Sequence, residues 1–124
     1  MQQWLLIGLA GAAGALTRFS LAGLVQRVLG SGFPWGTASV NVLGSLLFGI
    51  VWSLAEERLA ISPAARTIIL TGFMGAFTTF STFMFETSTL MRDSQWLFAA
   101  ANLIGQVALG LICMFIGLAI GRLL

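Results

Sequence analysis

The sequence predicts an all-α membrane protein with four transmembrane helices, and three observations lead to that fold class. Hydrophobic residues make up 58% of the 124 positions, only 8% of the residues are charged, and the mean hydropathy is +0.99. These values exclude a water-soluble globule. Four membrane crossings of about 20 residues each would use about 80 residues and leave only short connections. We therefore expect a single integral membrane domain over residues 1–124.

The first two spans are bounded by turn residues and by charge. Residues 4–25 are apolar apart from a short polar stretch around Arg18, and a glycine-containing turn follows. The second apolar run covers residues 38–54, with Thr37 as its expected N-cap. It ends before a charged cluster at residues 56–58.

The third and fourth spans differ in regularity. Residues 65–91 are apolar toward both ends, but a polar, glycine-containing segment interrupts them, so we expect this helix to be broken near residues 72–80. Residues 96–120 form the last hydrophobic stretch. As a straight helix this stretch would reach roughly 37 Å, which is enough to cross the membrane with some tilt.

The arginines near the span ends are almost evenly divided between the two sides of the membrane. With four spans, one side carries Arg58, Arg66 and Arg122, and the other carries Arg27 and Arg92. Because Lys and Arg near span ends set the direction of insertion, a chain this balanced can insert both ways and form an antiparallel, dual-topology homodimer. A weakly biased single topology is the alternative.

Several function classes are disfavoured by composition. The chain has no histidine and one cysteine, which excludes the common metal-site patterns and an intrachain disulfide. Its six arginines are scattered, so a nucleic-acid partner is not expected. An enzyme is also not expected, because there is no histidine, no cysteine pair and no pair of carboxylates near a plausible site.

Among the polar side chains within the predicted spans are Arg18, Asn41 and Glu86, which are costly there unless they face a cavity or a partner. Arg18 must meet an acid elsewhere, backbone carbonyls, or an anion in water. Asn41 offers two N–H donors to a pathway, or it bonds a neighbouring helix. Glu86 is either functional or a structural partner for Arg66 or Arg18.

The densest polar segment is residues 78–83, Thr-Thr-Phe-Ser-Thr-Phe. If the segment is helical, Phe80 and Phe83 lie on one face. The hydroxyls of this segment, including Ser81 and Thr82, are suited to line a wet path. Because the segment follows a predicted helix break, which frees backbone carbonyls, we interpret it as functional.

The fourth span adds an amide pair four residues apart. Asn102 and Gln106 share a helical face and either line the same path or bond across helices. Hydroxyl and amide donors, an intramembrane arginine and the electropositive edges of phenylalanine rings together favour an anion. The same donors also suit water or small neutral solutes.

Three motifs closely resemble the Fluc (CrcB) family of fluoride channels. They are Gly11-Ala12-Ala13-Gly14 followed by Thr17-Arg18-Phe19, Pro34-Trp35-Gly36-Thr37 with Val40-Asn41 and Gly44, and the run from Thr71 to Phe83 with Glu86. The resemblance implies an antiparallel, dual-topology homodimer in the bacterial inner membrane, in contact with lipid. It also implies passive export of fluoride that entered as the neutral acid, which lowers cytoplasmic fluoride and gives fluoride resistance.

The same resemblance implies roles for individual residues. Asn41 would donate to fluoride, Phe80 and Phe83 would present ring edges along the pore, and Ser81 and Thr82 would be polar lining.

The resemblance further implies a structural Na⁺ at the dimer interface, held by the backbone carbonyls of Gly75 and Thr78. Arg18 corresponds to the family's first-span arginine, in a vestibule or structural role. The family often carries a tyrosine or another hydrogen-bonding residue where this chain has Asn102, so the fourth span departs from the family pattern on the pore side.

Two other functions compete with a channel. A small four-helix proton-coupled transporter shares the size and the dual topology but is expected to carry an essential carboxylate, usually in the first span. The first span here has Arg18 instead, and Glu86 is the only carboxylate within a span. A structural membrane subunit would use the glycine-rich helices only for packing.

Overall fold

Four helical spans make up the structure, a computed structural model that describes all residues from Met1 to Leu124. The first, second and fourth spans are single helices: α1 (Gln2–Leu29), α2 (Trp35–Glu56) and α6 (Trp96–Leu123). All four spans are long and apolar enough to cross a membrane. The predicted all-α fold with four spans is therefore confirmed.

The helices extend beyond the apolar runs, because helical structure continues into the interfacial residues until a turn stops it. The α1 helix ends where Gly30 adopts a φ of 92°, a conformation that glycine accepts without strain. The α2 helix begins at Trp35, directly after Pro34, and the expected N-cap at Thr37 is wrong. Thr37 lies inside the helix, and its hydroxyl donates to Glu86 Oε1 of the third span at 2.7 Å instead of capping the helix.

The third span consists of four consecutive segments. They are α3 (Pro63–Thr67), the π-helical η1 (Ile68–Met74), α4 (Gly75–Phe77) and α5 (Phe80–Arg92). Between α4 and α5, Thr78 and Thr79 have extended backbone conformations. Thr79 is the N-cap of α5, since its side chain accepts from the Thr82 N–H. Helical hydrogen bonding is therefore suspended over two residues in the middle of this span.

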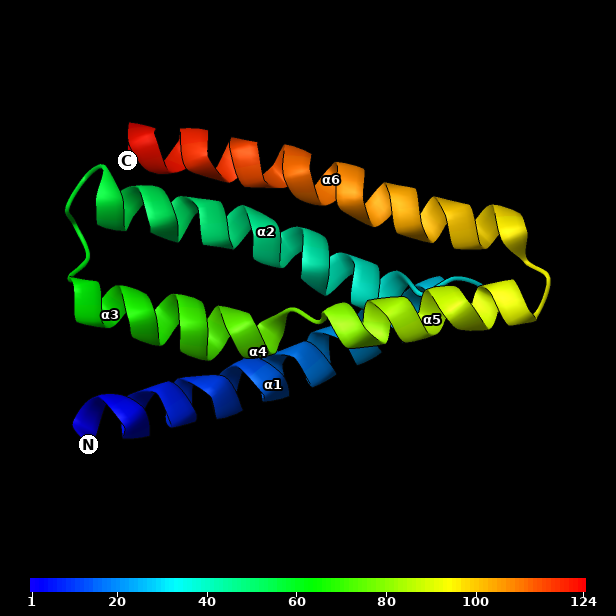
Figure 1. Cartoon of the computed structure of the whole chain (residues 1–124), viewed down its shortest axis with the longest axis horizontal. Helices are drawn as coiled ribbons and strands as arrows, with labels where there is room; N and C mark the ends of the chain where they lie inside the picture. The colour runs from blue at the N-terminus through cyan, green and yellow to red at the C-terminus, as the bar shows by residue number, and fades with distance from the viewer.

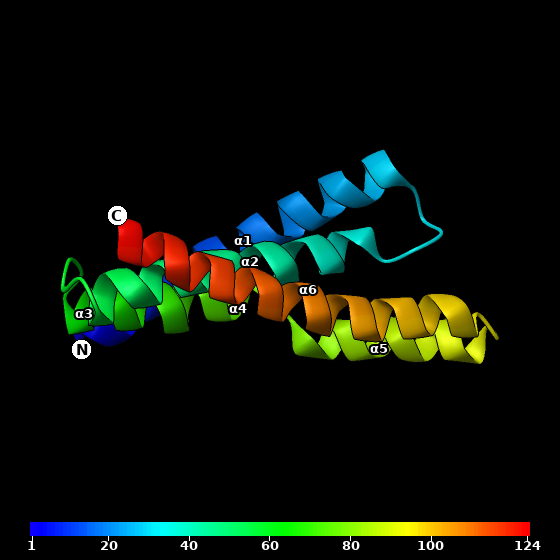
Figure 2. The same ribbon diagram turned by 90° about the horizontal axis from the view of Figure 1, so that it is seen from above.

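The packing order of the helices sets the position of these two residues. The α2 helix packs most extensively against α6, while α1 packs against η1 and α4, and α5 packs against α6. Both chain ends and the loop between α2 and α3 lie at one end of the molecule (Figure 1). Seen from above, the C-terminal half of α1 and the start of α2 diverge from α5 and α6 (Figure 2).

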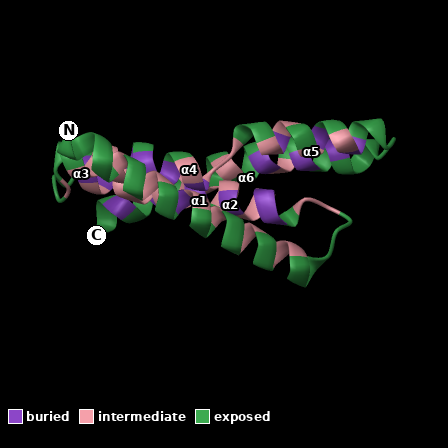
Figure 3. Cartoon of the chain, turned by 90° about the horizontal axis from the view of Figure 1, so that it is seen from below, coloured by how far each residue is buried: buried purple, intermediate pink, exposed green.

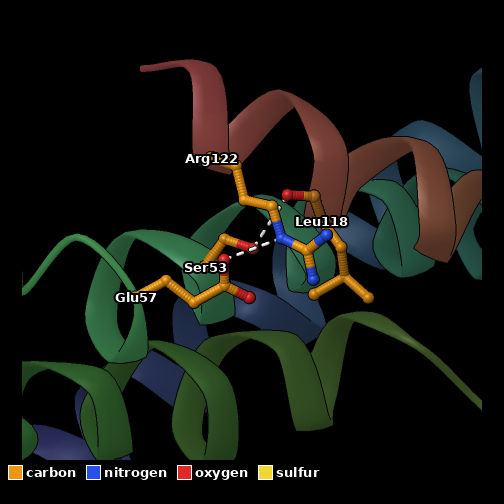
Figure 4. Close-up of polar contacts among 4 residues, drawn as sticks. All are labelled: Ser53, Glu57, Leu118 and Arg122. Carbon is orange, nitrogen blue, oxygen red and sulfur yellow. Dashed lines mark hydrogen bonds and ion pairs between the residues drawn. The ribbon is translucent and has the colours of Figure 1, made fainter.

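Two polar contacts join α2 to α6 near the end that carries the C-terminus (Figure 4). The fully buried Ser53 donates its hydroxyl to the Leu118 carbonyl at 2.9 Å. One turn further, Arg122 Nε donates to Glu57 Oε2 at 2.7 Å, in an exposed ion pair of small energetic value. The Ser53 contact requires the two backbones to approach closely, which glycines on both helices permit.

Little of the chain is buried within itself. Only 20 of the 124 residues are buried. Exposed positions run along most of α1 (Figure 3) and most of α6. Large apolar side chains such as Phe19 and Phe115, exposed at 79% and 68%, would be unfavourable in water. This surface is typical of helices that contact lipid tails or another membrane protein.

Candidate functional site

A pocket of about 380 Å³ lies where α2 and α6 meet the start of α5. It contains five predicted site residues, Asn41, Thr78, Phe80, Phe83 and Gln106. The complete lining is Asn41, Gly44, Ser45, Phe48, Thr78, Thr79, Phe80, Phe83, Gln106, Val107 and Met114. No ionisable side chain contributes to this lining.

Asn41 connects α2 to the non-helical segment of the third span. Its Oδ1 accepts from the Thr79 N–H at 2.8 Å, and its Nδ2 donates to the Thr79 carbonyl at 3.0 Å. The second N–H of the same amide donates to Gln106 Oε1 at 2.8 Å. Asn41 thus satisfies a peptide group that has no helical partner, at a depth where an unsatisfied group costs several kcal/mol.

The amide pair of α6 lies on the inner side of the helix. Gln106 donates to Asn102 Oδ1 at 2.8 Å, and Asn102 donates to Thr87 Oγ1 of α5 at 2.9 Å. Of the two roles expected from the sequence, bonding across helices is therefore observed for both residues. Gln106 also lines the pocket, whereas Asn102 is fully buried and does not.

The two phenylalanines of α5 meet edge to face, with ring centroids 6.1 Å apart and an interplanar angle of 83°. Phe83 is buried, with 6% of its surface exposed, whereas Phe80 is 73% exposed. The Phe80 ring is therefore largely exposed at the edge of the pocket, and Phe83 forms part of its wall.

The hydroxyls of residues 78–83 mainly bond their own segment. Thr78 donates to the Met74 carbonyl at 3.0 Å, and Thr79 Oγ1 donates to Thr82 Oγ1 at 3.0 Å. Ser81 is exposed, and neither Ser81 nor Thr82 lines the pocket of the protomer.

Two charged groups within the spans, Arg18 and Glu86, bind neutral partners. Arg18 Nε donates to the Ala76 carbonyl at 2.9 Å, at the end of α4. Glu86 is bonded through Oε1 to Thr37, while its buried Oε2 has no partner. Arg66 pairs with Glu56 instead. Glu86 is therefore not the structural partner of Arg66 or Arg18.

The interruption of helical hydrogen bonding at Thr78 and Thr79 leaves backbone N–H and carbonyl groups without helical partners on both sides. The Thr79 N–H, which would reach the Gly75 carbonyl in a continuous helix, donates to Asn41 instead. The Thr82 N–H donates to Thr79 Oγ1, so the Thr78 carbonyl also lacks its usual donor. The N–H groups of Phe80 and Ser81 have no acceptor in the protomer. Carbonyl oxygens and amide protons are thus available within a few residues of each other.

Sequence reasoning missed three contributors to this site. Ser45 lines the pocket and donates to the Asn41 carbonyl at 2.9 Å. Thr87 receives the Asn102 bond, and Thr37 binds Glu86. A serine or threonine within a helix usually bonds the carbonyl four residues before it, so its type alone does not indicate a tertiary role.

The chain is similar to known proteins over most of its length. The family model described as "CrcB-like protein, Camphor Resistance (CrcB)" matches residues 5–118. A relative from Nitrosococcus oceani named "Fluoride-specific ion channel FluC" is 60% identical over 95% of this chain and 94% of its own length. Proteins of the same name from Solidesulfovibrio magneticus and Nitratidesulfovibrio vulgaris are 57% and 55% identical. They cover 95% and 99% of this chain, and 94% and 99% of their own lengths.

Proposed function

This chain belongs to the CrcB family, and on that premise we propose that it is a passive, fluoride-selective ion channel of the bacterial inner membrane. It would export fluoride and lower its cytoplasmic concentration. The observation that carries the proposal is the pocket formed by Asn41, Phe80, Phe83 and Gln106 at the lapse in the third span. The name shared by relatives that cover nearly the whole chain supports the same ion.

The electrostatics of the pocket suit an anion. The 13-residue α5 begins inside the membrane, so the positive end of its dipole lies at the pocket. The free N–H groups of Phe80 and Ser81 and the amide of Asn41 are donors in the same place. Because Asn41 already gives both N–H groups to oxygen atoms, fluoride would bind it by replacing one of those acceptors.

Selectivity follows from the size of the ion. Fluoride is small and tightly hydrated, so a pore must replace its water with close donors, while other halides are larger and poorer acceptors. The pocket offers such donors beside apolar walls. It has no ionisable lining residue that could couple transport to protons, which supports passive conduction over a proton-coupled mechanism.

Replacing Phe80 or Phe83 by Ile should lower fluoride flux about tenfold, which corresponds to roughly 1.4 kcal/mol, because an aliphatic side chain has no electropositive edge to offer an anion. Flux from liposomes and size-exclusion profiles would be measured together. Phe115→Ile on the exposed surface of α6 is the control and should conduct normally. Wild-type flux in both pocket variants would show that the two phenylalanine rings play no part in conduction.

We also propose the antiparallel, dual-topology homodimer. The even division of arginines supports it, as does the open side of the pocket, where the exposed Phe80 is free to meet a second copy. Single cysteines at Ser31 or Ala60, in a Cys113→Ala background, would be labelled by an impermeant maleimide from outside intact cells. We expect about half-labelling at both positions. Full labelling at one and none at the other would establish a single topology.

A structural Na⁺ fits the free carbonyls. Gly75 and Thr78 each present a carbonyl oxygen without its helical donor, and unwound backbone carbonyls are typical Na⁺ ligands in membrane proteins. Gly75 is exposed in the protomer, so two copies could contribute carbonyls to one ion. Na⁺ would neutralise the oxygen dipoles and stabilise the dimer. Exchange of Na⁺ for N-methylglucamine should lower the melting temperature; an unchanged value would contradict the site.

Fluoride efflux from liposomes that contain the purified protein tests the function itself. Valinomycin dissipates the potential, an electrode follows fluoride, and chloride-loaded liposomes are the control. We expect rapid fluoride release with chloride retained. Flux that depends on a proton gradient and is lost in Glu86→Gln would favour a proton-coupled transporter. No release from folded protein would favour a structural subunit.

A further inference from the structure

A row of hydrogen-bonded polar side chains, half-buried at Asn41 and buried in the rest, joins three helices beside the pocket. Asn41 donates to Gln106 Oε1 at 2.8 Å, Gln106 donates to Asn102 Oδ1 at 2.8 Å, and Asn102 donates to Thr87 Oγ1 at 2.9 Å. Thr87 in turn donates its hydroxyl proton to the Phe83 carbonyl at 2.8 Å. We call Asn41, Gln106, Asn102 and Thr87 the amide relay.

At both ends of the relay, backbone groups determine which side-chain atom donates and which accepts. At one end, the Thr79 N–H donates to Asn41 Oδ1, so the NH₂ group of Asn41 must point away from that N–H and toward Gln106. At the other end, the Thr87 proton is committed to a carbonyl, so its oxygen can only accept from Asn102. Reversing any amide between these ends would place two donors or two acceptors against each other.

The relay is also shielded from solvent. Asn102, Thr87 and Gln106 are exposed at 0%, 4% and 7% of their surfaces. Because these side chains are shielded from bulk water, a reversed amide would leave buried polar atoms unsatisfied. The three residues therefore keep one arrangement rather than exchanging among several.

We propose that Gln106, Asn102 and Thr87 are positioning residues that fix the orientation of the Asn41 amide, so that its NH₂ group rather than its oxygen faces Gln106 at the wall of the pocket. An Asn41 amide in the reverse orientation would turn its oxygen lone pairs toward the same space, where they repel an anion. Thr87 acts through the other two, since it does not line the pocket. The consequence for fluoride rests on the proposed function, whereas the orientation of Asn41 does not.

Thr87, at the end of the relay opposite Asn41, provides the most direct test. Thr87→Val keeps the shape of the side chain and removes the only acceptor for Asn102. In the full chain in detergent, we expect the side-chain amide NMR signals of Asn41 and Gln106 to shift, although neither residue is altered. Fluoride flux should fall about tenfold, as expected for the loss of one buried hydrogen bond. Thr87→Ser should restore both.

Thr89→Val is the matched control. Thr89 lies on the same helix, and its hydroxyl bonds the Phe85 carbonyl at 3.0 Å in the same pattern, but it lies outside the relay. Loss of the Thr89 hydroxyl should leave the Asn41 amide signals unchanged. A purely structural role for Thr87 would lower stability without moving those signals, and that result would overturn the proposal.

Two further measurements test the proposal if the Thr87→Val protein does not fold. Asn102→Leu removes the centre of the relay and should shift the same Asn41 signals; unchanged signals would overturn the proposal. In the unaltered protein, the side-chain amide protons of Asn102 and Gln106 should exchange more slowly than those of exposed Gln95, and equal rates would also overturn it. If the unaltered protein shows no fluoride flux, only the proposed function is rejected, because the NMR measurements do not depend on transport.

Discussion

Asn41→Asp is expected to abolish fluoride flux while leaving the protein folded. The substitution is nearly isosteric, but it replaces two N–H donors by a carboxylate at the pocket. A unit charge about 4 Å from a passing anion costs roughly 4 kcal/mol at an effective dielectric constant of 20. That energy corresponds to a loss of about a thousandfold in rate. Liposome flux with an electrode readout would detect it.

The control for Asn41→Asp adds the same charge elsewhere. Gln95→Glu lies at the exposed start of α6 and should conduct like the unaltered protein. Undiminished flux in Asn41→Asp, with correct folding by size-exclusion chromatography, would show that Asn41 lies off the conducting path. Loss of flux in both variants would indicate a general effect of negative charge rather than a local one.

The second large effect is expected at the contact between α2 and α6. A Cβ atom at Gly117 would lie 2.1 Å from the Leu46 carbonyl oxygen, so the two helices would have to separate. Overpacking of this kind costs about 1–3 kcal/mol, against which alanine recovers up to about 1 kcal/mol of helix propensity. We expect Gly117→Ala to lower the free energy of unfolding by about 1–2 kcal/mol, measured by denaturation in mixed micelles.

Gly105 provides the matched control on the same helix. A Cβ atom there would meet no other atom within 4 Å, so Gly105→Ala should be neutral or slightly stabilising. Equal destabilisation by the two substitutions would mean that the close approach of α6 to α2 at Leu46 contributes little to stability. Flux in Gly117→Ala should fall with the folded fraction, since Gly117 does not line the pocket.

Local features of the sequence predicted the spans and part of the site. Each span is a long hydrophobic run, and the cluster of hydroxyls at residues 78–83 indicated a segment of which four residues line the candidate pocket. The pairing of Asn41 with Thr79 was not predictable, because the two lie 38 residues apart and meet only when α2 packs beside the third span. The role of Thr37 was mistaken for the same reason, since Glu86 is 49 residues away.

By itself, the sequence determined that this chain is all-helical with four membrane spans, and which polar side chains enter the hydrocarbon. These properties depend on hydrophobic length and on backbone satisfaction within each segment, which are local. Only the tertiary structure decided which of those polar groups meet. A hydrogen bond forms only when donor and acceptor come within about 3 Å. That distance is set by how closely the helices pack, and glycines such as Gly117 allow α6 to bring Gln106 and Asn102 between α2 and α5.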